Sequence, residues 1–222
     1  MTFFKTALLN QIRILRMKEN FFAYGKLETD YLKSKDRRLA KVIEKVGHIN
    51  RTCDSDLFSS VVHHIIGQQI STKALTTIWQ RLNDKFKTVS PKTIGAASNE
   101  ELQSLGMSFR KVSYIKDFCE KINTGEFNLR AVKKMNDADA INALVSLKGV
   151  GVWTAEMILL FCLQRPNIFS YGDFEILRGL RILFRHEEIS KELFEKYRKK
   201  FSPYCSVASL YLWEVAGGKV AT

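Results

Sequence analysis

Apolar residues recur at steps of three and four from Asp36 almost to the end of the 222-residue chain. This spacing places them on one face of a helix, whereas a half-buried strand alternates at steps of two. Only 12 glycines and 3 prolines interrupt the chain, which is below average usage and favours helices over a many-stranded sheet. The 45% of hydrophobic residues can fill a sizeable core. The pattern therefore predicts an all-α protein of about ten short helices.

Capping residues give the expected starts of these helices. The pattern turns helical at Asp36, and the later helices are expected to begin at Asp54 or Asp56, Ser71, Ser98, Ser108, Asp137 and Asp173. A long apolar helix is expected from about Val152 to Leu163, and a final pair over about 190–201 and 203–216. We find no repeat and no clear linker, so we expect an N-terminal extension or first helix over 1–30, one domain over 31–217 and a tail over 218–222.

The chain is strongly basic, with 35 Lys and Arg against 23 Asp and Glu and a net charge of +12. Such an excess favours a polyanionic partner, because basic side chains release counterions from phosphates. Charge alone fits a ribosomal protein or a membrane-surface protein equally well. Residues 1–18 are basic and carry apolar residues. They are open to three interpretations: a targeting helix, an ordinary first helix, or a non-native extension before a start at Met17.

The four cysteines, Cys53, Cys119, Cys162 and Cys205, are scattered along the chain. Their spacing fits neither a zinc or iron–sulfur site nor a secreted disulfide framework, so we expect reduced thiols in a cytosolic protein. No apolar run reaches the length of a membrane span, and no membrane partner is expected. The four histidines, His48, His63, His64 and His186, show no metal-binding spacing and are expected at the surface or in the core.

Two glycines two residues apart separate two predicted helices in Leu147-Lys148-Gly149-Val150-Gly151. Glycine permits a tight turn and a close backbone approach. The second helix then begins with unpaired N–H groups, which together with the helix dipole bind a phosphate without reading a base. A plain helix–helix corner is the alternative. The candidate phosphate contacts are Lys148, Gly149, Gly151 and Val152.

A longer stretch, from Leu147 through Val152-Trp153-Thr154-Ala155 to Gly172-Asp173, resembles the helix-hairpin-helix DNA glycosylase (HhH-GPD) superfamily. Upstream, the run from Ile65 to Ala74 is similar to its 3-methyladenine DNA glycosylase II branch. The same is true of Asp36-Arg37-Arg38-Leu39-Ala40 and of the stretch from Gly106 to Lys111. The resemblance covers about 30–217 and implies two helical lobes flanking a cleft, without a β-domain.

The resemblance implies a monofunctional enzyme that removes alkylated purines of the 3-methyladenine and 7-methylguanine class from double-stranded DNA. Asp173 would be the catalytic carboxylate, although an Asp at a helix start is more often only an N-cap. Bifunctional members carry a lysine at the position of Trp153. An indole cannot form a Schiff base, so no AP-lyase activity is expected.

The resemblance also implies which residues contact the DNA and the flipped base. Gln69, with Ile70 beside it, would fill the gap left by a flipped nucleotide. Trp153, Phe174 and Tyr204 would wall the base pocket, with Met157 where some relatives carry an aromatic residue; core packing is the alternative for Phe174 and Tyr204. The carbonyls of Val145, Leu147 and Val150 would hold a structural Na⁺ or K⁺. No cofactor is expected to be required, and no iron–sulfur cluster.

Some alternatives stay open at this point. Arg178, Arg181 and Arg185 form either a row facing DNA or a solvated helix face. The same fold acting on oxidised or mismatched bases is a second possible function, and a non-enzymatic hairpin module that only binds DNA is a third. The resemblance implies a monomer located in the cytoplasm with the nucleoid in a prokaryote, or in the nucleus in a eukaryote.

Overall fold

The computed structural model describes residues 20–218. This range contains thirteen helices and no strand, with one isolated antiparallel bridge between Phe21 and Thr52. The all-α prediction is confirmed. The helices are α2 (Lys26–Lys35), α3 (Arg37–Val46), α4 (Leu57–Gly67), α5 (Thr72–Phe86), α6 (Pro91–Ala96), α7 (Asn99–Gln103), α8 (Phe109–Asn123), α9 (Leu129–Lys134), α10 (Asp137–Val145), α11 (Val152–Phe161), α12 (Phe174–Phe184), α13 (Lys191–Phe201) and α14 (Cys205–Ala216).

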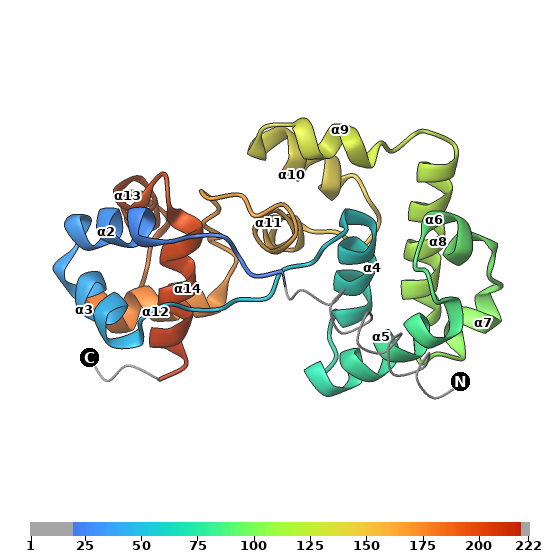
Figure 1. Cartoon of the computed structure of the whole chain (residues 1–222), viewed down its shortest axis with the longest axis horizontal. Helices are drawn as coiled ribbons and strands as arrows, with labels where there is room; N and C mark the ends of the chain where they lie inside the picture. Colours follow the sequence, from blue (N-terminus) through green and yellow to red (C-terminus); the bar gives the residue numbers. More distant parts are fainter. Residues whose placement is uncertain (1–19, 219–222) are drawn as a thin grey trace, which may run out of the picture.

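The two lobes are formed by different parts of the chain (Figure 1). One lobe combines α2 and α3 with α12, α13 and α14, so the beginning and the end of the described chain pack together. The other lobe contains α4 to α8, in which α6 and α7 pack on α8 and α4 packs on both α5 and α8. Helix α11 lies between the lobes and packs on α4 and α10, while α10 also contacts α9. Residues from both lobes can therefore meet around α11.

Side-chain caps set most of the helix starts, as expected. The predicted helix starts Ser71, Ser98, Ser108 and Asp173 accept first-turn amides, and so does Asp36, where the helical pattern begins. Before α4, Asp56 is the cap and accepts from Ser59 N. The prediction of Asp137 as a cap was wrong by one residue, because Asn136 accepts from Asp139 N and Asp137 is already helical.

The structure contains three helices that periodicity did not predict, α2, α6 and α9. Each of them buries a single apolar side chain, so none carries a stripe that the sequence could reveal. Conversely, the apolar helix expected to reach Leu163 ends at Phe161. The interpretations of residues 1–18 lie outside the described range.

The contact between α12 and α14 is close enough to require a glycine. A Cβ at Gly179 would lie 2.9 Å from the main-chain carbon of Leu212, and nearer still to its carbonyl oxygen. Because backbone cannot swing aside as a side chain does, any larger residue would force the two helices apart. This contact fixes the position of the N-terminus of α12, where Asp173 lies.

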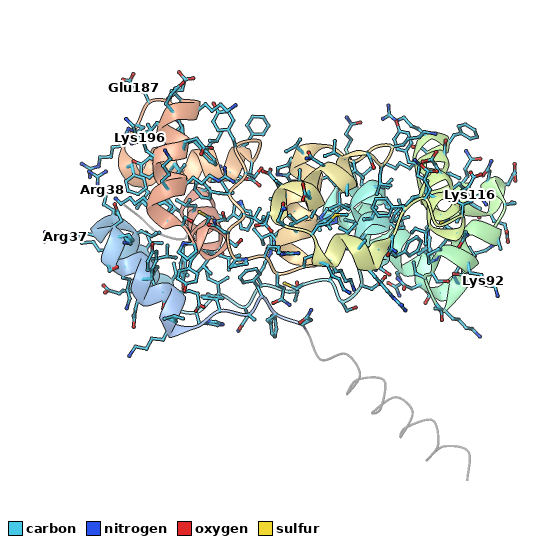
Figure 2. All side chains as sticks on the ribbon, turned by 90° about the horizontal axis from the view of Figure 1, so that it is seen from above. Arg37, Arg38, Lys92, Lys116, Glu187 and Lys196 are labelled. Atoms are coloured by element: carbon cyan, nitrogen blue, oxygen red, sulfur yellow. The ribbon has the colours of Figure 1, made fainter. Side chains whose placement is uncertain are left out.

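Basic side chains lie on both lobes. In Figure 2, Arg37 and Arg38 lie at one end of the molecule and Lys92 and Lys116 near the other. All four cysteines are free, as expected, and burial raises the pKa of Cys119, Cys162 and Cys205 to about 12. Between residues 20 and 218, no helix combines the length and hydrophobicity needed to cross a bilayer.

Candidate active site

Asp173 caps α12 and is also buried, with 6% of its surface exposed. Its Oδ1 accepts hydrogen bonds from the amides of Glu175 and Ile176, both at 3.0 Å. These bonds are those of an ordinary N-cap, so the capping interpretation is confirmed. They also fix the carboxyl group at the positive end of a helix dipole.

Two tryptophan side chains, one before and one after Asp173 in the sequence, donate hydrogen bonds to its carboxylate. Trp153 Nε1 on α11 donates to Oδ2 at 3.0 Å, and Trp213 Nε1 on α14 donates to Oδ1 at 3.2 Å. Asp173 therefore accepts four hydrogen bonds, with both oxygens engaged, which matches the acceptor-only chemistry of an ionised carboxylate. The arrangement joins α11, α12 and α14 at one group.

A cavity of about 730 Å³ opens beside Asp173. Trp153, Phe161, Trp213 and Met157 give it large apolar walls. The volume lies in the range of small-molecule sites. Its charged residues are mainly acidic, in contrast to the basic chain as a whole; they are Asp54, Asp173, Glu175 and Glu214, with Arg51 as the basic member.

The structure brings some of the predicted pocket residues together but not all of them. Trp153 and Met157 line the cavity with Asp173, although Met157 is 3% exposed. Phe174 is 83% exposed on the surface, and Tyr204 packs edge-on against Tyr31 with ring centroids 5.1 Å apart. Neither residue lines this cavity. Their assignment to the base pocket stays a prediction that this geometry does not support.

Sequence reasoning missed Trp213 and Phe161. Their rings stack with centroids 5.6 Å apart and form one wall of the cavity. The available signal was weak: a tryptophan in an apolar helix needs a hydrogen-bond partner for its N–H when it is buried. That rule indicates a polar neighbour without saying which one. Only the fold shows that the partner is Asp173.

The loop between α4 and α5 carries the two predicted wedge residues. Gln69 is exposed and has φ of 56°, so its backbone is in the left-handed region. Lys111 Nζ donates to the carbonyls of Ile66 and Gln68 at 2.8 and 2.7 Å. Burial lowers the pKa of Lys111. The lysine thus caps the C-terminal end of α4 and fixes the loop on which Gln69 stands.

The same loop is bonded to the glycine-rich hairpin between α10 and α11. Gln68 Nε2 donates to the carbonyl of Gly149 at 2.6 Å. A second cavity, of about 610 Å³, lies between loop and hairpin and is lined by Gln68, Gln69, Gly149, Trp153 and Arg110, among others. The predicted wedge loop and the predicted phosphate site therefore form one connected surface.

The hairpin turn depends on Gly149, whose φ is 81°. A Cβ there would lie 2.7 Å from Tyr114 Cε2, so the turn also packs closely on α8. Gly151 caps α11 without a side-chain bond, and Val152 after it is 56% exposed. The predicted phosphate contact Lys148 forms an ion pair with Asp117 at 2.5 Å.

The three main-chain carbonyl oxygens that are expected to bind Na⁺ or K⁺ are of the right chemical type for such an ion. Val145 ends α10, and Leu147 and Val150 follow in the turn. The Leu147 carbonyl accepts from Val150 N at 3.1 Å, which leaves its second lone pair. Main-chain carbonyl oxygens are the ligands that replace the hydration shell of an alkali cation. The cation stays a prediction.

The expectation that the histidines lie at the surface or in the core is incomplete. His63 and His64 are half-buried and line both cavities. Desolvation lowers the pKa of His63. Arg178, Arg181 and Arg185 are all exposed, which leaves both interpretations of the arginine row open.

Several known proteins that are similar to this chain are named as DNA-3-methyladenine glycosylases or glycosidases. A DNA-3-methyladenine glycosidase structure from Bacillus halodurans superposes with a TM-score of 0.79 at 32% identity, covering 89% of this chain and 93% of the other. DNA-3-methyladenine glycosylase 1 of Schizosaccharomyces pombe is 26% identical over 196 residues, 84% of this chain and 85% of its own length. YfjP of Bacillus subtilis is 28% identical over 184 residues, and this match covers 79% of this chain and 64% of the relative.

A structure of the S. pombe 3-methyladenine glycosylase in complex with abasic DNA shares the fold, with a TM-score of 0.73 at 24% identity over 88% of this chain and 98% of that one. The family model described as "HhH-GPD superfamily base excision DNA repair protein" matches residues 62–203. That span includes the wedge loop, the hairpin and Asp173. The chain therefore belongs to the HhH-GPD superfamily of base excision DNA repair proteins.

Proposed function

We propose that the protein hydrolyses the N-glycosidic bond of alkylated purines of the 3-methyladenine and 7-methylguanine class in double-stranded DNA and leaves the strand uncut. The observation that carries this proposal is the pairing of Asp173 with an indole at Trp153 beside a cavity of base-accommodating size. The names of the relatives support the choice of lesion class.

In the proposed reaction, the carboxylate of Asp173 provides the main electrostatic stabilisation of the transition state. Breaking the N-glycosidic bond builds positive charge on the deoxyribose, and a fixed carboxylate nearby stabilises that transition state. Because four donors orient Asp173 before the substrate arrives, little reorganisation is needed during the reaction. The same group is suited to orient or deprotonate the attacking water.

The cavity favours an electron-poor or cationic leaving base. Trp153 and Trp213 line the cavity, and a cation–π contact between an indole and a cationic base contributes about 0.5–2 kcal/mol. The acidic residues around them add attraction for positive charge. An alkylated purine that is already cationic needs little protonation to depart, which suits a site whose central residue is an acceptor.

Incubation with methylated duplex DNA, with and without borohydride, tests the proposal and separates its alternatives. We expect released methylpurines and no trapped protein–DNA adduct. A trapped adduct would contradict the hydrolytic scheme, since only an amine nucleophile forms a reducible Schiff base. Release of only oxidised or mismatched bases would favour the second function. Binding without release from any lesion would favour a DNA-binding module.

We expect Gln69→Ala to slow base release from paired duplex DNA by about tenfold or more, because nothing then fills the gap left by the flipped nucleotide. Single-turnover kinetics on a duplex lesion measure this effect. The same lesion opposite an abasic site is the control, because its pairing is already lost and the variant should excise it at close to the normal rate. Normal rates on both substrates would contradict the wedge assignment.

We expect Trp213→Phe to slow base release about 10- to 100-fold while preserving the cavity wall. The substitution keeps an aromatic ring against Phe161 but removes the N–H that donates to Asp173. A hydrogen bond to a charged group contributes about 1.5–3 kcal/mol. Single-turnover rates at saturating enzyme measure the loss, and unchanged rates would show that this donor does not position the carboxylate.

A further inference from the structure

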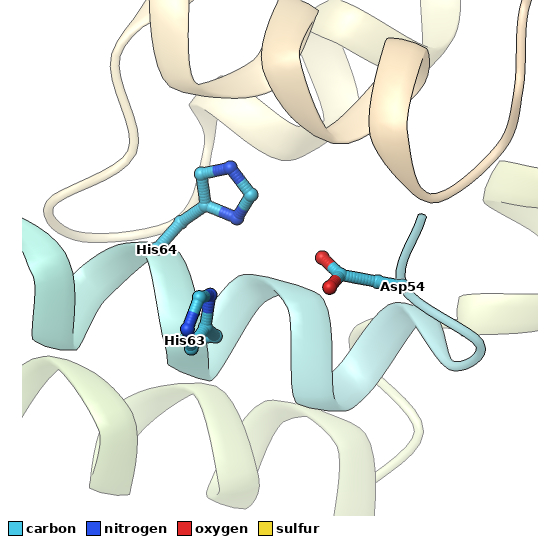
Figure 3. A group of neighbouring side chains, drawn as sticks. All are labelled: Asp54, His63 and His64. Atoms are coloured by element: carbon cyan, nitrogen blue, oxygen red, sulfur yellow. The ribbon is translucent and has the colours of Figure 1, made fainter. Parts of the chain in front are cut away.

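Asp54, His63 and His64 form a cluster in the wall of the cavity beside Asp173, and the proposed reaction gives neither histidine a role (Figure 3). One nitrogen or oxygen atom of each lies within 4.8 Å of those of the other two. Asp54 precedes α4, and the two histidines lie on that helix. All three side chains are half-buried and border the open cavity.

We propose that these three side chains bind a divalent metal ion of the zinc type. Two imidazole nitrogens and one carboxylate oxygen are borderline donors that suit Zn²⁺, Co²⁺, Ni²⁺ and Cu²⁺ better than Mg²⁺ or Ca²⁺. Three protein ligands facing a cavity leave the fourth tetrahedral position for water. The cluster thus has the donor number and type of an open zinc site.

Neighbouring contacts hold each of the three ligands in place. Ser60, which is fully buried, donates from Oγ to Asp54 Oδ2 at 2.5 Å. Its carbonyl accepts from His64 Nδ1 at 2.9 Å. The His63 ring packs edge-on against Trp79, with centroids 4.8 Å apart. Contacts of this kind around metal-binding side chains hold them in the orientation needed for binding and raise the affinity for the metal ion.

The distances allow an ion to bind with small side-chain movements. Three atoms separated by no more than 4.8 Å lie at most about 2.8 Å from their common centre. Zinc bonds to nitrogen and oxygen are about 2.0–2.2 Å long. Each ligand atom therefore moves inward by at most about 0.7 Å, which a modest side-chain rotation provides without moving the backbone.

Isothermal titration calorimetry of the 222-residue chain with Zn²⁺ tests the site directly and does not depend on any enzymatic activity. Co²⁺ absorption provides a second measurement. We expect one equivalent to bind in the micromolar range. Asp54→Asn, His63→Gln and His64→Gln should each weaken binding by about tenfold or more, and Ser60→Ala by about tenfold through loss of orientation.

Two matched variants control for other metal-binding groups. His186→Gln removes a histidine that contacts Tyr197 elsewhere, and Cys53→Ser removes the thiol next to Asp54; neither should change the affinity. Thermal melting identifies any variant that fails to fold, and the remaining ligand variants then decide the result. Absence of Zn²⁺ binding, or binding that survives the ligand substitutions but is lost in Cys53→Ser or His186→Gln, would overturn the proposal.

Occupation of the site has a consequence that rests on the proposed function. A bound ion adds two positive charges to the wall of the cavity and opposes entry of a cationic base. We expect saturating Zn²⁺ to slow release of methylpurines by the wild-type protein and to have little effect on His63→Gln. Because binding is measured separately, failure of the glycosylase assignment and failure of the metal site give distinguishable results.

Discussion

Asp173→Asn is expected to reduce base release by about 100- to 1,000-fold while leaving abasic-DNA binding within about threefold of wild type. The transition state loses its negatively charged neighbour, and one such electrostatic group typically contributes about 10²–10³ in rate. Asparagine caps helices as well as aspartate does, so the bonds from Glu175 and Ile176 can persist. Single-turnover excision of a methylated base and a titration with abasic duplex measure the two effects.

A second N-cap aspartate provides the matched control. Asp36 accepts from the amides of Arg38 and Leu39 at the start of α3, just as Asp173 does at α12. It does not line the cavity beside Asp173. Asp36→Asn should therefore retain base release. If both variants lost activity equally, helix capping would explain the effect; near-normal release by Asp173→Asn would refute the catalytic assignment.

Gly179→Ala is expected to lower the free energy of unfolding by about 3 kcal/mol. The added methyl group would overlap the main chain of Leu212 where α12 packs on α14. Overpacking against a fixed backbone is among the larger single-residue effects. For a protein of this size, about 3 kcal/mol corresponds to a fall in melting temperature of roughly 6–12 °C. Thermal and denaturant unfolding measure the change.

Gly95→Ala tests whether the loss arises from the backbone contact rather than from any glycine substitution in a helix. A Cβ at Gly95 would meet only side-chain atoms, at 3.2 Å from Asn123 and 3.4 Å from Cys119. These atoms can shift, and alanine favours the helix by about 1 kcal/mol. We expect stability within about 1 kcal/mol of wild type. Equal losses in both variants would contradict the packing argument for Gly179.

The local signals in the sequence predicted most helix starts and the hairpin correctly. Asp36, Ser71 and Ser108 cap helices because their side chains reach amides two or three residues away, which is a property of the local sequence. The glycine at position 149 has a left-handed φ, as the tight turn predicted between the two helices requires. Such features depend on few neighbours, so pattern reasoning found them.

The composition of the cavity was predicted less well. Trp153 and Asp173 were expected to lie together, but Phe174 and Tyr204 do not line the cavity, whereas Trp213 and Phe161 do. A position next to Asp173 in the sequence does not determine where a side chain points. Phe174 follows Asp173 directly, yet it is 83% exposed at the first turn of α12.

The sequence by itself determined the helical character of the chain, its caps, its hairpin and, through the motif around Trp153 and Asp173, the family. The tertiary structure alone decided that Trp213, 40 residues after Asp173, donates to the same carboxylate. It also brought Asp54 and the two α4 histidines into the wall of that cavity. The reason is physical: caps and turns are set by contacts within about four residues, whereas a cavity is formed by helices whose packing brings distant segments together.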